Sequence, residues 1–346
     1  MIGPDARIAV AGAGSIGCYV GACLALAGRN VVFLARPQLV DALHDYGMRI
    51  TDLDGRDRTL LPGAIEATAD PAAVLTDAAV ILLTVKSGDT GGMADLIRRF
   101  ASPDALVVSL QNGVDNVPLL RERLGAGRIV AAMVPFNVAQ TWPDGRPAFH
   151  RGTSGHIVIA SGRPDLRSLL YVDGIGCMDH PDMAGPAWSK LALNMNNALN
   201  ALSGLPLQRQ LSDRAWRRVL AAQIGELLRV TKAAGIALPP IEGVRPRTIP
   251  TILRLPDTLF GLVARRMLAI DPNATSSMAE DLAARRPTEI DYLQGAVVRL
   301  AEAHGTSAPI SEAIISAVRE TERSGRKWSA KALSDRIAYQ CRPVGE

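Results

Sequence analysis

Residues 8–17 read Ile-Ala-Val-Ala-Gly-Ala-Gly-Ser-Ile-Gly, so a short apolar run leads directly into a G-x-G-x-x-G pattern. Its glycines are Gly12, Gly14 and Gly17, and a helical pattern over residues 15–27 follows at once. A strand, a glycine-rich turn and a helix in this order are the context that a dinucleotide-binding loop requires. The first glycine permits the tight turn, the second lets the backbone approach a pyrophosphate, and the third lets helix and strand pack closely. We therefore predict that this stretch binds a dinucleotide.

Backbone N–H groups at the start of the helix would hold the pyrophosphate. The second strand, predicted over residues 31–36, ends at Arg36, where NAD-dependent proteins usually carry Asp or Glu. A guanidinium instead suits a 2′-phosphate, because its planar fork donates two charged hydrogen bonds. The predicted cofactor is therefore NADPH, with a merely solvent-facing Arg as the alternative. Besides Arg36, the predicted cofactor contacts are Gly12, Ala13, Gly14, Ser15, Ile16 and Gly17.

Short apolar runs alternate with helical stretches through the first half of the chain, which is typical of a doubly wound parallel sheet. Residues 148–151 and 156–161, joined by Gly152-Thr-Ser-Gly155, predict an antiparallel hairpin that finishes the sheet. Beyond residue 181 helical periodicity dominates. We predict an α/β Rossmann-type domain over residues 1–181 and an all-α domain over 182–346. The main predicted helices of the second domain span residues 187–202, 212–234, 293–304 and 310–323.

Composition narrows the classes of protein. The 38 basic and 34 acidic residues leave a net charge of +4, and aromatic residues are only 4% of the chain, so we expect no nucleic acid partner. The sequence lacks an apolar run of about 18 residues and an N-terminal signal pattern, which predicts a cytoplasmic protein without membrane association. The four cysteines and five histidines show no metal-ligand spacing, so we predict no metal.

Polar residues follow two of the predicted buried strands. Lys86 ends the apolar run 78–86, and Asn112 follows the run 105–110 within Gln-Asn-Gly. The carboxyl ends of strands in an open α/β sheet border the ligand crevice, so both side chains are predicted to bind the cofactor. A solvated strand-end Lys and an ordinary Asn-Gly turn are the alternatives.

The predicted helix 187–202 carries a polar stripe. At about 100° per residue, Lys190, Asn194 and Asn197 share one narrow face, while their neighbours are apolar. A buried Lys is unfavourable unless it is paired or used, and burial lowers its pKa, which suits a group that must release a proton. We therefore predict a catalytic Lys190, with a lysine whose head reaches the surface as the alternative.

With these motifs the chain resembles the ketopantoate reductase family, in order and with similar spacing to about residue 320. The resemblance implies a 6-phosphogluconate-dehydrogenase-like helical domain and NADPH-dependent reduction of a 2-oxo acid. The best single substrate that it implies is 2-dehydropantoate, which would be reduced to pantoate in pantothenate biosynthesis. It further implies that Lys190 is the general acid, that Glu289 tunes it, and that Asn112 helps to hold the cofactor. Substrate would bind at Asn194, Asn197 and Ser277. The resemblance rests on residues 12–17, 36, 84–86, 111–113, 188–194, 276–278 and 286–292.

One position departs from the family pattern. Members that act on ketopantoate commonly carry an Asn eight residues after the catalytic Lys, where this chain has Ala198; Asn197 is a partial substitute. The Pro- and Arg-rich stretch 243–271 is also longer than a compact member needs. A related 2-hydroxyacid dehydrogenase with another substrate and a non-catalytic NADPH-binding sensor therefore stay open, as does a homodimer.

Overall fold

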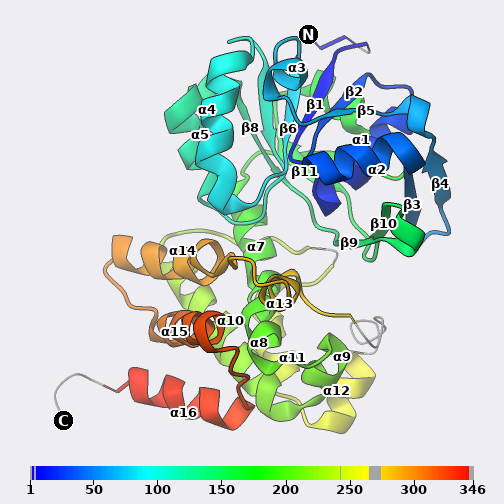
Figure 1. Ribbon diagram of the computed structural model, residues 1–346. Coiled ribbons are helices and arrows are strands. Elements are labelled where there is room, and N and C mark those ends of the chain that lie inside the picture. The colour runs from blue at the N-terminus through cyan, green and yellow to red at the C-terminus, as the bar shows by residue number, and fades with distance from the viewer. Residues whose placement is uncertain (1, 4, 242, 265–273, 343–346) are drawn as a thin grey trace. The chain divides into compact units, whose positions relative to one another are not determined.

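The computed structural model describes residues 2–3, 5–241, 243–264 and 274–342. The chain divides into two compact units, Met1–Met183 and Ala184–Glu346. Figure 1 shows that the first unit contains the sheets and the second is built from helices. The predicted fold class, a Rossmann-type domain followed by a helical domain, is confirmed.

The first unit contains an eight-stranded sheet of order β12-β11-β8-β7-β6-β1-β2-β5. The strands from β5 to β8 in this order run parallel to one another, whereas β11 is antiparallel to β8. From β1 the chain goes first to β2 on one side and later to β6 on the other, and ligands of open α/β sheets bind at such a switch point. The strands are β1 (Ile8–Ala11), β2 (Val31–Leu34), β5 (Glu66–Thr68), β6 (Val80–Leu83), β7 (Leu106–Ser109), β8 (Ile129–Met133), β11 (Ile157–Ala160) and β12 (Cys177–His180).

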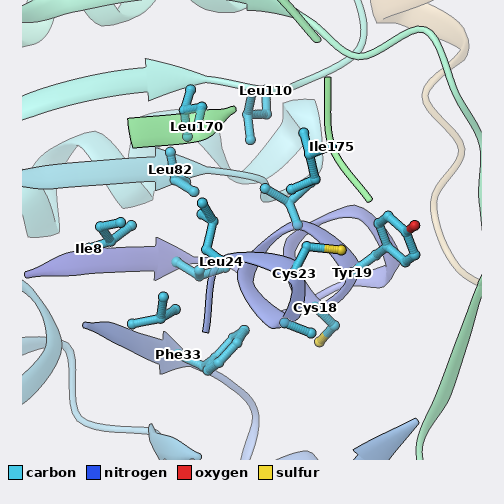
Figure 2. Close-up of a cluster of buried hydrophobic side chains, with 14 of the residues drawn as sticks. Ile8, Cys18, Tyr19, Cys23, Leu24, Phe33, Leu82, Leu110, Leu170 and Ile175 are labelled. Carbon is cyan, nitrogen blue, oxygen red and sulfur yellow. The ribbon is translucent and has the colours of Figure 1, made fainter. Parts of the chain in front are cut away.

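Both faces of this sheet are covered, which explains the unbroken apolar runs of the sequence. Ile8 and Val10 of β1 belong to the core cluster on one face, and Ala9 and Ala11 to the cluster on the other. Figure 2 shows the first cluster, in which side chains of β1, β2 and β6 gather with those of α1. The helices are α1 (Ser15–Leu26), α2 (Pro37–Tyr46), α3 (Pro71–Leu75), α4 (Thr90–Phe100), α5 (Asn116–Leu124) and α6 (Pro164–Leu170).

The predicted hairpin of residues 148–151 and 156–161 is wrong, because its two strands lie in different sheets. β10 (Ala148–Arg151) pairs with β3 (Met48–Asp52) and β9 (Val138–Thr141) in a four-stranded sheet that β4 (Asp57–Leu60) completes. β11 instead pairs with β8 and β12. Phe149 accounts for the pairing of β10 with β3, because it packs in the core with residues of β3. The local sequence pattern does not reveal this long-range contact.

In the second unit, the single helix predicted over 187–202 is interrupted at Met195. The side-chain amide of Gln294 donates a 3.2 Å hydrogen bond to the Met195 carbonyl, and such an insertion interrupts a helical ladder. The other predicted helices are present with small shifts of their ends. The helices are α7 (Ala184–Asn194), α8 (Asn196–Ser203), α9 (Leu207–Ser212), α10 (Arg214–Ala233), α11 (Ile249–Leu253), α12 (Asp257–Val263), α13 (Ser277–Ala283), α14 (Ile290–Ala303), α15 (Pro309–Ser324) and α16 (Ala330–Gln340).

The long stretch 243–271 contains α11 and α12, and its part from residue 265 lies outside the described residues. Arg217 of α10 is fully buried and holds both helices. It donates to the Leu253 carbonyl at 3.2 Å and to the Asp257 carboxylate at 2.5 Å, and its guanidinium stacks on the Phe260 ring. Within the described part of the chain, no helix is long and apolar enough to cross a membrane.

Candidate cofactor and catalytic sites

The three glycines of the loop have different surroundings. Gly12 has a φ of +108°, and a Cβ atom there would lie 2.7 Å from the Val85 backbone nitrogen. At Gly17 a Cβ atom would lie 2.4 Å from the Gly12 carbonyl oxygen. Gly14 is exposed, and a Cβ atom there would meet nothing within 4 Å. The first and third glycines are thus required by the backbone itself, while the second leaves open space where a ligand can approach.

Gly14 is also the N-cap of α1, and a glycine has no side chain with which to cap the helix. The first-turn N–H groups of a helix need partners from outside the helix and attract anions. Thr84, at the end of β6, fixes the loop from the neighbouring strand: its hydroxyl donates a 2.5 Å hydrogen bond to the Gly12 carbonyl. This cradle fits a pyrophosphate.

Arg36 lies where the sequence places it, just after β2 and at the N-cap of α2. The residue before it, Ala35, is buried, whereas Arg36 is exposed. The guanidinium makes no ion pair or hydrogen bond with any residue that the structure describes. It is therefore available to an anionic ligand at this end of the sheet.

The structure brings together the loops that carry Lys86 and Asn112. Both side chains are exposed. The Asn112 carbonyl accepts a 2.7 Å hydrogen bond from the Asn116 amide and a 3.3 Å bond from the hydroxyl of Ser87. The Asn116 amide also donates to Ser87 at 3.0 Å, and the Thr90 hydroxyl donates to Asn116 at 2.9 Å. A shared buried network thus fixes the two strand ends relative to each other.

Our reading of the sequence missed this network, since Ser87, Thr90 and Asn116 were not among the predicted site residues. They are 0–3% exposed, so they support the site from behind. Their signal was the run of polar residues that follows each apolar strand, from which only Lys86 and Asn112 are predicted as site residues.

Lys190 lies on α7 and is only 7% exposed. Its neighbours Trp188 and Leu191 are buried as well. Burial lowers the pKa of the ammonium from 10.5 to about 8, because an apolar environment disfavours the charged form. Lys190 is thus buried, as predicted. The alternative, a lysine whose head reaches the surface, does not fit this side chain.

The predicted stripe with Asn194 and Asn197 is divided between two helices. Asn194 is the last residue of α7 and is buried, and Asn197 lies in the first turn of α8 and is half-buried. The intervening Met195 carries the bond from Gln294. The Met195 backbone is itself helical, with φ −54° and ψ −30°, and its N–H bonds to the Leu191 carbonyl at 3.0 Å, so two adjoining helical segments carry all three residues.

Glu289 is the N-cap of α14 and is half-buried. The residue before it, Thr288, is fixed by Glu322 of α15, whose carboxylate accepts a 2.7 Å bond from the Thr288 hydroxyl. Gln294 lies five residues after Glu289, and its partner Met195 lies five residues after Lys190. This bond therefore links the helices that carry the two predicted catalytic residues.

Ser277 begins α13 and is exposed, whereas its neighbour Ser276 is buried. The Ser276 hydroxyl accepts a bond from the Ala279 N–H and donates one to the Asn197 carbonyl, at 3.2 and 3.0 Å. Asn197 and Ser277, the two residues predicted to bind substrate, are thus connected through Ser276. Ala198 is fully buried in α8.

Comparison with known proteins gives consistent matches along the chain. The pattern of the "ketopantoate reductase PanE/ApbA" family matches residues 8–163, and the pattern of the C-terminal part of that family matches residues 182–322. A 2-dehydropantoate 2-reductase of Halobacterium salinarum is 29% identical over 92% of this chain and 100% of its own length. One from Mycobacterium tuberculosis is 29% identical over 89% of this chain and 95% of its own length.

Solved structures agree. A PanE/ApbA family ketopantoate reductase from Ralstonia eutropha superposes with a TM-score of 0.76 at 32% identity, over 91% of this chain and 98% of its own. A D-mandelate dehydrogenase solved with NADH and anilino(oxo)acetate has a TM-score of 0.74 at 20% identity, covering 92% of this chain and 99% of its own. At that identity it shows the shared fold alone.

Proposed function

Because the chain belongs to the ketopantoate reductase family, we propose that it reduces a 2-oxo acid to a 2-hydroxy acid, with 2-dehydropantoate as the best single substrate. The product would then be pantoate, an intermediate of pantothenate biosynthesis. Family membership confirms the sequence-based expectation of an NADPH-dependent oxidoreductase that acts on a small molecule.

The observation that carries the proposal is the buried Lys190 with its lowered pKa. Bound NADPH would supply the hydride that reduces the carbonyl carbon. As the carbon accepts the hydride, the electron pair of the C=O bond moves to the oxygen, and the Lys190 ammonium gives that oxygen a proton. A cation at this oxygen binds the developing alkoxide more strongly than the ketone, which lowers the barrier. Burial lowers the pKa of Lys190 to about 8, closer to neutral pH, where a general acid is most effective.

The other residues receive supporting roles in this proposal. Glu289 orients and tunes the ammonium. Asn194, Asn197 and Ser277 bind the hydroxyl and carboxylate groups of the substrate. The glycine loop, Lys86 and Asn112 hold the cofactor, and Arg36 binds its 2′-phosphate.

We also propose a cytoplasmic homodimer. The four thiols are free and three of them are buried, which fits a reducing compartment. A structural neighbour from Staphylococcus aureus is described as a dimeric ketopantoate reductase. Light scattering on the purified protein tests the dimer: a monomer mass at micromolar concentration would contradict it.

The decisive experiment follows NADPH absorbance at 340 nm with a panel of 2-oxo acids. We expect 2-dehydropantoate to give the highest kcat/KM. If another 2-oxo acid is preferred, the chain is a related 2-hydroxyacid dehydrogenase, an outcome for which the buried Ala198 leaves room. If none is reduced while NADPH still binds tightly, the protein is a sensor and the proposal is wrong.

A further inference from the structure

A network of amide side chains joins α8 to α9. Asn200 of α8 and Gln210 of α9 are both fully buried. Gln210 exchanges two hydrogen bonds with the side chain of Asn196, of 2.8 and 3.2 Å. The Asn200 amide nitrogen donates to the Leu205 carbonyl at 2.8 Å and to Gln210 at 3.3 Å. Because both of its hydrogens are directed to partners on this side, the Asn200 side chain is held in one orientation.

The remaining polar atom of this amide faces the segment before α13. The Asn200 side-chain oxygen accepts a 2.8 Å hydrogen bond from the Ser276 backbone N–H. The Ser276 hydroxyl donates in turn to the Asn197 carbonyl at 3.0 Å. Ser276 is thus bonded to α8 at two points, and the next residue is the exposed Ser277. These bonds set where Ser277 lies relative to Asn197.

Stability alone gives no reason for an amide at this position. A buried amide must keep its hydrogen bonds to offset the loss of hydration, whereas a leucine of similar size would need none. A fully satisfied buried network does, however, specify one arrangement of the elements that it joins. The arrangement specified here is that of two proposed substrate-binding residues.

We propose that Asn200 is a positioning residue for substrate binding, which holds Ser277 beside Asn197 so that both side chains can bind the 2-oxo acid. The inference rests on the proposed function. Asn200 itself does not touch the substrate; it acts through Ser277. A residue that fixes a binding group changes substrate affinity more than the chemical step, because the proton donor Lys190 lies on another helix, α7.

The test compares steady-state kinetics of wild type, Asn200→Leu, Ser277→Ala and the double variant with 2-dehydropantoate and saturating NADPH. Asn200→Leu should raise KM at least about tenfold and change kcat less than about threefold, since a bond to a charged substrate group is lost. Calorimetric binding of pantoate in the presence of NADP⁺ should weaken by the same factor. The double variant should have the KM of Ser277→Ala, because the two changes remove the same interaction.

Thr231→Val is the matched control, since it also replaces a buried polar side chain of the helical unit by an apolar one. The Thr231 hydroxyl bonds only to carbonyls of its own helix, α10. Its KM should equal that of wild type. Additive effects in the double variant, or an unchanged KM in Asn200→Leu, would overturn the inference. If Asn200→Leu does not fold, Ser276→Ala decides, because it removes the hydroxyl that bonds to the Asn197 carbonyl and also caps α13, and it should raise KM. If the wild type reduces no 2-oxo acid, the proposed function fails and the inference with it. If the wild type is active, the kinetics of the variants test the role of Asn200 alone.

Discussion

The two units of this protein present their functional groups in different ways. In the first, the proposed cofactor-binding residues 12–17 are consecutive in the sequence, and Thr84, which supports them, comes from an adjacent strand end. In the second, the proposed site residues lie on α7, α8, α13 and α14, more than 80 residues apart along the chain at the extremes. The proposed site residues of the first unit thus lie in one local motif. Those of the second unit are held in place by tertiary contacts, such as those of Asn200 and Gln294.

This difference predicts that binding and chemistry can be separated by mutation. Lys190→Ala should lower kcat by about 10²–10⁴-fold, the usual contribution of a general acid, and leave NADPH affinity within about twofold of wild type. Stopped-flow hydride transfer and fluorescence titration of NADPH measure the two quantities. The exposed Lys232 on α10 offers the matched control, as Lys232→Ala should change neither. Retained activity in Lys190→Ala would remove this residue from the mechanism.

The glycine loop offers a second separation, inside a single motif. Gly17→Ala forces a Cβ atom to 2.4 Å from a backbone oxygen and should lower the free energy of unfolding by about 1–3 kcal/mol or more. Gly14→Ala meets nothing within 4 Å, and its φ of −87° suits any residue. It should therefore unfold at the wild-type denaturant concentration and still bind NADPH at least about tenfold more weakly. Equal stability losses in both variants would contradict the open space at Gly14, and unchanged NADPH affinity in Gly14→Ala would show that this space does not serve the cofactor.

The sequence predicts the glycine loop of the first unit better than the helix arrangement of the second, because the loop depends on local residues and the arrangement on distant ones. The roles of Gly12, Gly14 and Gly17 are predicted from neighbours within six residues. The backbone at Gly12 and Gly17 leaves no room for a Cβ atom, and the space at Gly14 is open, as those roles require. The pairing of β10 with β3 was missed, because a local pattern does not encode which distant strand fills an edge. The break at Met195 was missed as well, since its cause, Gln294, lies 99 residues away. Glu289 was found only through the family resemblance, because an acidic residue at the start of a helix is common.

Arg36 tests whether the first unit distinguishes NADPH from NADH. Arg36→Ala should weaken NADPH binding about 10–100-fold, the effect of losing charge-assisted hydrogen bonds to a phosphate, and leave NADH binding unchanged. Fluorescence titration with both cofactors measures this ratio. Arg58→Ala, which removes an exposed guanidinium from β4 in the same unit, should change neither affinity. An equal loss for both cofactors would contradict the assignment of the 2′-phosphate to Arg36.

The pH dependence tests the catalytic side, and here activity and stability should move in opposite directions. Reduction needs the protonated Lys190, so kcat/KM should fall about tenfold per pH unit above its pKa of about 8. The unfolded chain keeps this proton up to its ordinary pKa of 10.5, so it binds more protons than the folded chain between the two values. The folded state should consequently gain up to about 3 kcal/mol relative to a Lys190→Met variant as pH rises from 8 to 10.5. Denaturant unfolding of both proteins at pH 7 and pH 10 measures this gain. A constant difference, or a kcat/KM profile that stays flat to pH 10, would mean that Lys190 titrates as an ordinary surface lysine.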